Sequence, residues 1–179
     1  MCGIVGYIGP KDATPILIGG LKRLEYRGYD SAGVALIDRG ALETRRAEGK
    51  IARLEGVLAE QPVKGHVGIG HTRWATHGPP SDRNAHPHLS TDNTVAVVHN
   101  GIIENADALR KELQRKGHTF RSDTDTEVLS HLIQELFEGS LEEAVIGALR
   151  VVEGTYGIAV VSSKDPGKIV GARRGSPLL

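Results

Sequence analysis

Hydrophobic residues along this chain fall into two kinds of pattern. Short continuous runs, such as residues 4–8, are typical of buried strands, whereas apolar residues at every third or fourth position are typical of amphipathic helices. The first such repeat predicts a helix over residues 14–25, with Thr14 as its N-cap and Pro15 in the first helical position. Two strand-like runs then flank Asp38-Arg39-Gly40, which predicts a hairpin.

The rest of the chain alternates between the same two patterns. In chain order it predicts a short helix at 51–58, a strand at 67–73, a strand at 94–99 ending in a tight turn at Asn100-Gly101, a helix at 105–116 capped by Asn105, a short strand at 119–120, helices at 125–136 and 141–152, and strands at 156–161 and 169–172. Hairpins mixed with helices favour an α/β fold built in layers over an all-parallel doubly wound sheet.

Two stretches depart from these patterns. Residues 74–93 are rich in Pro, His, Gly, Asn, Ser and Asp and show no apolar period; a loop of about twenty residues inside a compact domain is usually functional or disordered. Residues 175–179 end on what resembles the start of another apolar strand. We therefore expect the chain to be a piece of a longer protein.

The amino-acid composition argues against several classes of function. The 179 residues suffice for one domain with a sizeable core, and 22 basic residues balance 22 acidic ones, which argues against a nucleic-acid surface or a membrane-attracted face. The single cysteine excludes an intrachain disulfide and fits a reducing cytosol. There is no signal-peptide pattern, and no apolar run approaches the roughly 18 residues of a membrane helix. We expect a cytoplasmic protein.

The single cysteine, Cys2, directly follows Met1. Its small side chain allows an aminopeptidase to remove Met1, and the mature chain then begins with the thiol. One residue would carry both a nucleophile and a base, because its α-amino group has an ordinary pKa of about 7.7 to 8.0. A free thiol has a pKa of about 8.5 and needs such activation at neutral pH. The alternative is a cysteine that merely precedes a small hydrophobic strand.

Polar clusters at the ends of expected strands supply further candidates. Arg27, between a helix and a strand, could steady a nearby carboxylate or carbonyl, or form an ordinary surface ion pair. The planar fork of Arg73 matches a carboxylate, and Trp74, the only tryptophan, is placed to act as an aromatic lid. The alternative is an exposed arginine beside a tryptophan packed under its own loop.

Two more clusters fit the binding of a small amino acid. Asn100 followed by Gly101 offers two donors, the arrangement that an oxyanion hole requires, although an Asn-Gly hairpin turn is the commoner use of this pair. Asp125 is by default a helix N-cap, but its carboxylate could bind an ammonium group. Arg73 and Asp125 in one cleft would hold a free α-amino acid at both of its charged ends.

The histidines support a metal site only weakly. His71 and His77 are six residues apart, and His86 and His88 flank a proline. These spacings lack the helical geometry of a chelating pair and match no HExxH or CxxC motif. We expect neither a metal ion nor a cofactor.

Taken together, these residues resemble the glutaminase domain of the N-terminal-nucleophile (class II) glutamine amidotransferases. The matching stretches cover nearly the whole chain: 2–6, 23–33, 71–78, 84–88, 98–105 and 124–127. The run Trp74-Ala75-Thr76-His77 indicates the branch that acts on sugar phosphates. Phosphoribosyl amidotransferases and asparagine synthetases resemble the chain only at Cys-Gly-Ile and around Asn-Gly.

The resemblance implies a four-layer α/β/β/α sandwich of two mostly antiparallel sheets. It implies that Cys2 attacks the side-chain amide of L-glutamine, that a γ-glutamyl thioester forms as ammonia leaves, and that water then releases glutamate. In the full-length enzymes of this branch the ammonia serves the conversion of fructose-6-phosphate to glucosamine-6-phosphate. Residues 1–179 are then one glutaminase domain that lacks its C-terminal part and the sugar isomerase domains.

The resemblance also implies a role for each candidate residue. Asn100 and the Gly101 N–H would hold the oxyanion, and Arg73 and Asp125 the α-carboxylate and α-amino group of glutamine. Thr76 and His77 would line the glutamine site, and Trp74 would belong to the mobile loop that gates ammonia transfer. Arg27 would position the terminal cysteine, and His86 and His99 would have supporting roles.

The implied partners are L-glutamine and the sugar isomerase domain of a full-length enzyme, itself expected to be a homodimer. Nucleic acid and membrane are not expected partners. The alternative function is a non-catalytic glutamine-binding or regulatory module that keeps the pocket without turnover.

Overall fold

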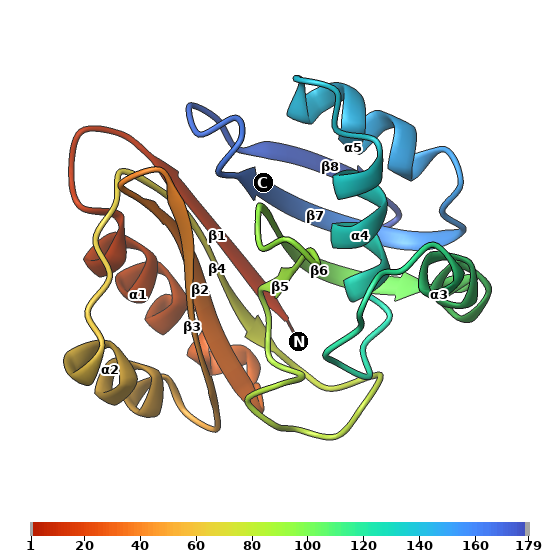
Figure 1. The fold of residues 1–179 in the computed structure, drawn as a ribbon. Coiled ribbons are helices and arrows are strands. Elements are labelled where there is room, and N and C mark those ends of the chain that lie inside the picture. Colours follow the sequence, from red (N-terminus) through yellow and green to blue (C-terminus); the bar gives the residue numbers. More distant parts are fainter. Residues whose placement is uncertain (1, 178–179) are drawn as a thin grey trace.

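A computed structural model describes residues 2–177, which form four layers (Figure 1). Two four-stranded antiparallel sheets face each other, and helices cover the outer face of each. The first sheet has the order β1 (Gly3–Ile8), β4 (Val67–Arg73), β2 (Ser31–Asp38), β3 (Ala41–Glu48), and the second has the order β5 (His88–Leu89), β6 (Val95–Ile103), β7 (Gly154–Ser162), β8 (Val170–Arg174). The α/β/β/α sandwich implied by the resemblance is confirmed.

The helices are divided between the two outer layers. Those packed on the first sheet are α1 (Ala13–Arg23) and α2 (Ile51–Glu60), with the short 3-10 helix Glu25–Arg27 after α1; those on the side of the second sheet are α3 (Ala106–Arg115), α4 (Glu127–Glu135) and α5 (Leu141–Leu149). No helix within residues 2–177 has the length and apolar character needed to cross a bilayer.

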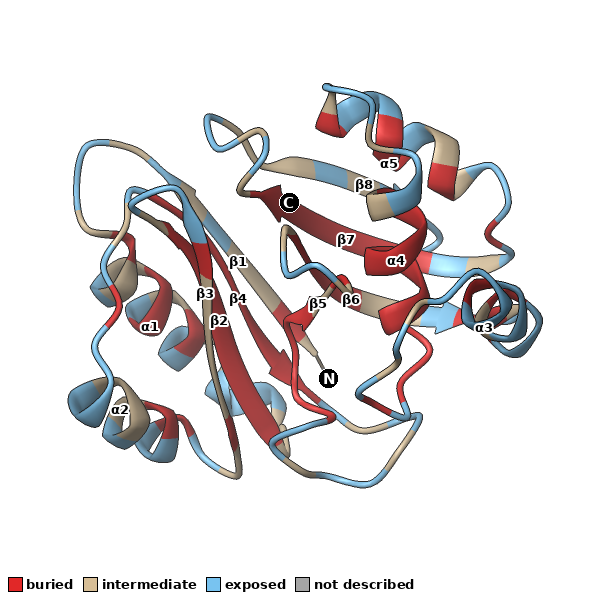
Figure 2. Cartoon of the chain, viewed as in Figure 1, coloured by how far each residue is buried: buried red, intermediate tan, exposed pale blue. Residues whose placement is uncertain are grey.

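Three hydrophobic clusters hold the layers together. One lies under α1 and α2, one under α3, α4 and α5, and the third joins the sheets through residues such as Ile69 on β4 and Val98 on β6. Strands β2, β4 and β7 are buried along almost their whole length (Figure 2). Because helices cover one face and the other sheet covers the opposite face, such strands read as continuous apolar runs.

The first half of the chain follows its predicted pattern, with two differences. The hairpin turn at Asp38-Arg39-Gly40 is confirmed, with φ of 49° at Arg39 and 82° at Gly40, the signs that a two-residue hairpin turn requires. The cap of α1 is Asp12, which accepts from the Thr14 N–H at 3.1 Å, so the prediction of Thr14 was wrong. Strand β1 is less buried than predicted because it lies at a sheet edge, where Ile8 is 51% exposed.

The predicted turn at Asn100-Gly101 is wrong. Strand β6 continues through both residues to Ile103, with Asn100 opposite Gly157 and Gly101 opposite Tyr156 in β7. Gly101 instead has a φ of 137°, a conformation that favours glycine within the strand. Pairing along the whole of β7 outweighs the local preference of the dipeptide for a turn.

Other differences arise where side chains find distant partners. Asn105 occupies the N-cap position of α3 as predicted, but its side chain makes no capping hydrogen bond. Its amide instead donates to the carbonyl of Val151 and accepts from the N–H of Glu153. The strand predicted at 119–120 is absent from the described chain, because the Thr119 N–H donates to the Thr91 hydroxyl rather than to a sheet edge.

Element ends also differ from their predicted positions. Helix α4 begins at Glu127 rather than at 125, α5 ends at Leu149 rather than at 152, and the loop at 74–93 contains the short strand β5. Of the apolar strand expected at 175–179, residues 178–179 lie outside the described residues.

Candidate active site

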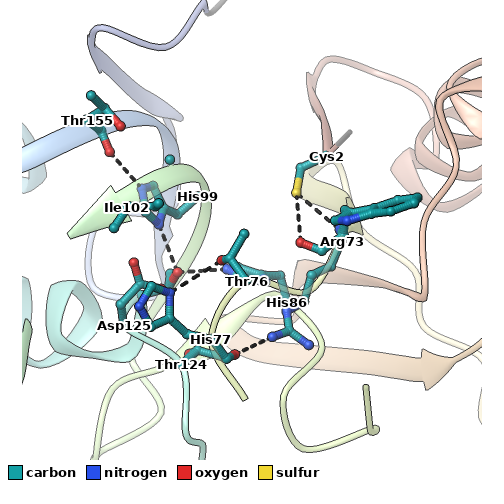
Figure 3. A pocket seen from close by; sticks show the side chains of 13 residues that line it. Cys2, Arg73, Thr76, His77, His86, His99, Ile102, Thr124, Asp125 and Thr155 are labelled. Atoms are coloured by element: carbon teal, nitrogen blue, oxygen red, sulfur yellow. Dashed lines mark hydrogen bonds and ion pairs between the residues drawn. The ribbon is translucent and has the colours of Figure 1, made fainter. Parts of the chain in front are cut away.

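A cavity of about 290 Å³ lies where the start of β1, the end of β4 and the second half of β6 meet (Figure 3). Its lining residues are Cys2, Arg73, Trp74, Thr76, His77, His86, His99, Gly101, Ile102, Thr124, Asp125, Thr126 and Thr155. Most of the predicted site residues therefore line this one cavity. The exceptions are Arg27 and Asn100, which line a second cavity of about 440 Å³ together with Ile4 and Gly6 of β1.

Backbone pairing positions the thiol. Gly3 in β1 lies opposite Thr72 in β4, which brings the preceding Cys2 beside the end of β4. The Trp74 N–H donates to Cys2 Sγ at 3.2 Å. Burial raises the pKa of the Cys2 thiol above its ordinary value, although the hydrogen bond from Trp74 and the charge of Arg73 act in the opposite direction. A base is therefore needed to form the thiolate at neutral pH.

Arg73 is almost fully buried, with 3% of its surface exposed. Its Nη2 donates to the carbonyls of His77 and Gly78, which folds the loop after β4 back over the cavity. Asp30 lies on its other side, 3.9 Å from Nη1. Nη1 is buried and finds no hydrogen-bond acceptor among the described residues, so a donor is left for an anionic ligand.

Asp125 lies in the same cavity as the thiol and the guanidinium. The prediction that it caps a helix is wrong, because its Oδ2 accepts from the Ile103 N–H of β6 at 2.8 Å and α4 begins two residues later. Its Oδ1 lies 4.0 Å from His77 Nδ1. The carboxylate is 7% exposed and is thus a buried negative charge facing a binding cavity.

Two buried histidines, His86 and His99, form hydrogen bonds with the same hydroxyl group, that of Thr126. Thr126 Oγ1 lies 2.9 Å from both His86 Nε2 and His99 Nδ1, and His99 Nε2 donates to the Thr155 carbonyl at 3.3 Å. Because that carbonyl only accepts, His99 Nδ1 accepts from Thr126, and His86 Nε2–H donates to Thr126. Burial lowers the pKa of both rings, that of His86 well below its usual value. Neutral rings joined in this way support the wall of the cavity.

Trp74 extends over the surface beside the cavity. Its side chain is 55% exposed, and one edge of the ring lies so close to Gly28 that an added Cβ there would approach it to 2.9 Å. Thr76 and His77, two and three residues further along the same loop, line the cavity. Within residues 2–177, no three His, Cys, Asp or Glu side chains are arranged to hold a metal ion.

Sequence reasoning assigned no role to several lining or adjacent residues. Thr124 and Thr126 flank Asp125, so their position in the cavity could have been inferred from that assignment. Asp30, which accepts from the Ala75 N–H and so ties down the loop after β4, was noted only as part of a polar cluster. Thr155 comes from β7, and no local pattern indicates its place beside β6.

Gly101 allows a close approach of two strands. An added Cβ would lie 2.1 Å from the Thr155 carbonyl oxygen, and φ of 137° disfavours any L side chain. We expect Gly101→Ala to lower the free energy of unfolding by about 2 kcal/mol or more. Gly19→Ala is the matched control: Gly19 is exposed in α1 with no heavy atom near its Cβ position, so stability should rise by about 0.5–1 kcal/mol. Urea unfolding of both variants checks this, and equal stabilities would contradict it.

A family model described as a glutamine amidotransferase domain matches residues 71–175, more than half of the chain. This chain belongs to the glutamine amidotransferase domain family. The matched range holds every lining residue of the cavity except Cys2. The family resemblance drawn from the sequence is confirmed.

Curated relatives match this chain from its first residue to its last. The glutamine--fructose-6-phosphate aminotransferase (isomerizing) of Clostridium acetobutylicum is 56% identical over 179 residues, and that of Symbiobacterium thermophilum is 57% identical over the same length. Each match covers 100% of this chain and 29% of the relative. The chain thus spans less than a third of the length of these relatives.

The solved structure of glutamine phosphoribosylpyrophosphate amidotransferase from B. subtilis, complexed with ADP and GMP, has the same fold. It aligns with a TM-score of 0.77 and 30% identity over 91% of this chain and 35% of its own. The likeness to phosphoribosyl amidotransferases is therefore wider than the two short stretches matched in the sequence. The amidotransferase domain described here has the fold of the N-terminal-nucleophile enzymes.

Proposed function

We propose that this chain hydrolyses L-glutamine to glutamate and ammonia, with Cys2 as the nucleophile once Met1 is removed. The observation that carries the proposal is that one cavity of about 290 Å³ holds a thiol, a buried guanidinium and a buried carboxylate. These three groups match the reacting amide and the two charged ends of an amino acid. Relatives named as glutamine-dependent aminotransferases add independent support.

The free α-amino group of mature Cys2 takes the thiol proton, and Sγ attacks the amide carbon of glutamine. The C–N bond of the tetrahedral intermediate then breaks. The nitrogen takes the proton from the ammonium group and leaves as ammonia, so that a γ-glutamyl thioester remains. Water, deprotonated by the same amine, attacks the thioester carbon, and glutamate and the thiol are released.

Charged groups at the far end of the cavity orient the substrate. Nη1 of Arg73, which lies 3.9 Å from Asp30 but makes no hydrogen bond among the described residues, donates to the α-carboxylate. Asp125 accepts from the α-ammonium group. Thr76 and His77 line the same site, and Trp74 borders it. Holding both ends fixes the amide carbon near Sγ, which converts binding energy into alignment for attack.

The oxyanion is held by the Gly101 N–H and the Asn100 amide. Gly101 lines the cavity itself, and Asn100 lies next to it on β6. Arg27 helps to position the N-terminal residue from the neighbouring cavity, and His86 and His99 support the wall through Thr126. Preorganised donors of this kind stabilise the charge that develops on the amide oxygen.

In a full-length protein of the kind found in the relatives, the ammonia would pass to a sugar isomerase domain for conversion of fructose-6-phosphate to glucosamine-6-phosphate. The names of the relatives and the extent of the match support this part of the proposal. We place the enzyme in the cytoplasm and expect the full-length form to be a homodimer.

A direct test measures glutamate release from glutamine by this chain, together with its intact mass. The expected result is glutamate release by protein that has lost Met1, and addition of 6-diazo-5-oxo-norleucine to Cys2 alone. Processed protein that binds glutamine without releasing glutamate would overturn the proposal. A C-terminally extended version is the control for a requirement for further chain.

A further inference from the structure

His71 is a fully buried residue to which the proposed mechanism gives no role. It lies on β4, opposite Ile4 in β1 and Gly33 in β2. Its ring contacts the ring of His86, with centroids 4.3 Å apart, and His86 in turn contacts His88 at 4.5 Å. His71 therefore does not line the cavity itself but contacts His86, which does.

The ring makes one close hydrogen bond, to a residue of the proposed oxyanion hole. His71 Nε2 lies 2.8 Å from Asn100 Oδ1, whereas Nδ1 has no hydrogen-bond partner among the described residues. An amide oxygen only accepts, so Nε2 carries the proton. Burial lowers the pKa of His71 to about 4 despite this bond, so at neutral pH the ring is uncharged and Nε2–H is its single donor.

This bond determines which end of the Asn100 amide is turned away from His71. An asparagine amide can rotate by half a turn, and one orientation offers N–H donors where the other offers an acceptor. With Oδ1 held by the Nε2–H of His71, the NH₂ group must lie on the other side of the amide. The opposite orientation would put an oxygen lone pair toward a developing negative charge.

We propose that His71 is a positioning residue that holds the Asn100 amide with its NH₂ group turned outward as an oxyanion donor. The proposal rests on the function proposed above, since it gives Asn100 the same role. This bond joins β4 of the first sheet to β6 of the second, at the residue that precedes Gly101 of the cavity.

One test reads the proton itself and needs no activity. In the ¹⁵N-histidine-labelled chain, the His71 signals are assigned by their loss in His71→Gln, and long-range ¹H–¹⁵N spectra identify the protonated nitrogen. We expect a neutral ring protonated at Nε2. A ring protonated at Nδ1, or charged at neutral pH, overturns the proposal whether or not the chain releases glutamate.

The kinetic test uses a matched pair of variants. Gln and Met are similar in size, but only the Gln amide can place an N–H near the position of Nε2. We expect His71→Met to lower kcat by about 10-fold or more, part of the roughly 10²- to 10³-fold loss caused by removing an oxyanion donor, with KM nearly unchanged. His71→Gln should recover most of that loss. Equal kcat values for the two variants would contradict the role.

A double variant separates positioning from stability. If His71 acts through Asn100, His71→Met should cause no further loss of kcat in an Asn100→Ala background. Multiplied losses would instead indicate an independent or merely structural effect. If His71→Met does not fold, the NMR measurement of which ring nitrogen carries the proton decides whether His71 has the proposed role. Absence of glutamate release by the unmodified chain would defeat the proposed function while leaving that measurement decisive for His71.

Discussion

Cys2→Ala is expected to abolish glutamate release, with a loss of at least about 10⁴-fold, because no other group in the cavity can form the thioester. Glutamine binding should change little, since the proposed contacts of Arg73 and Asp125 with the charged groups of the substrate do not involve the thiol. Glutamate production, followed by a coupled assay, and isothermal titration with glutamine measure the two quantities.

Alanine is a matched replacement at this position. It is small enough to permit removal of Met1, so the variant and the unmodified chain can be compared with the same N-terminal processing, checked by intact mass. The thiol accepts a hydrogen bond from the exposed Trp74 loop and is not part of a hydrophobic cluster, so the fold should not depend on it. Glutamate release by the alanine variant at an unchanged rate would eliminate Cys2 as the nucleophile.

Asp125→Asn is expected to raise KM for glutamine by roughly 10- to 100-fold, which corresponds to the about 1.5–3 kcal/mol contributed by a hydrogen bond to a charged group. The asparagine oxygen can still accept from the Ile103 N–H, so the substitution removes the charge while keeping the bond that orients the side chain. Steady-state kinetics of glutamate release measure the effect.

A substrate analogue tests the contact itself. Glutaramate lacks the α-amino group, so the unmodified chain should bind it more weakly than glutamine, whereas Asp125→Asn should no longer distinguish the two. Asp107→Asn, an exposed charge removal in the first turn of α3, is the control and should leave both KM values unchanged. If Asp125→Asn discriminates as strongly as the unmodified chain, the carboxylate does not bind the amine.

Much of the fold could be predicted because its signals are local. The apolar start of β4, residues 67–70, and the Arg39-Gly40 turn each determine their own structure within a few residues. The predictions fail where a residue distant in the sequence determines the local structure. Asn100-Gly101 was expected to turn, but β7 supplies pairing partners for both residues. The default interpretation of Asp125 as a helix cap also fails, because its carboxylate accepts from an N–H of β6.

The site was predictable to a similar extent. Cys2 and Arg73 could be found because each carries its chemistry in its own side chain. Asp30 and Thr155 were missed because their importance comes from contacts across the fold, to the loop after β4 and to His99. The hydrogen bond between His71 and Asn100 joins different sheets, and no spacing along the chain encodes it.

Two contacts of described residues place the sulfur of Cys2 beside the end of β4: the pairing of Gly3 with Thr72 and the hydrogen bond from the Trp74 N–H. Exopeptidase trimming would then change the acid–base chemistry of the residue and leave its location alone. Under the proposed mechanism, the fraction of molecules that have lost Met1 is the largest fraction of a purified sample that can be active. A tag fused ahead of Cys2 would then abolish activity without disturbing the fold.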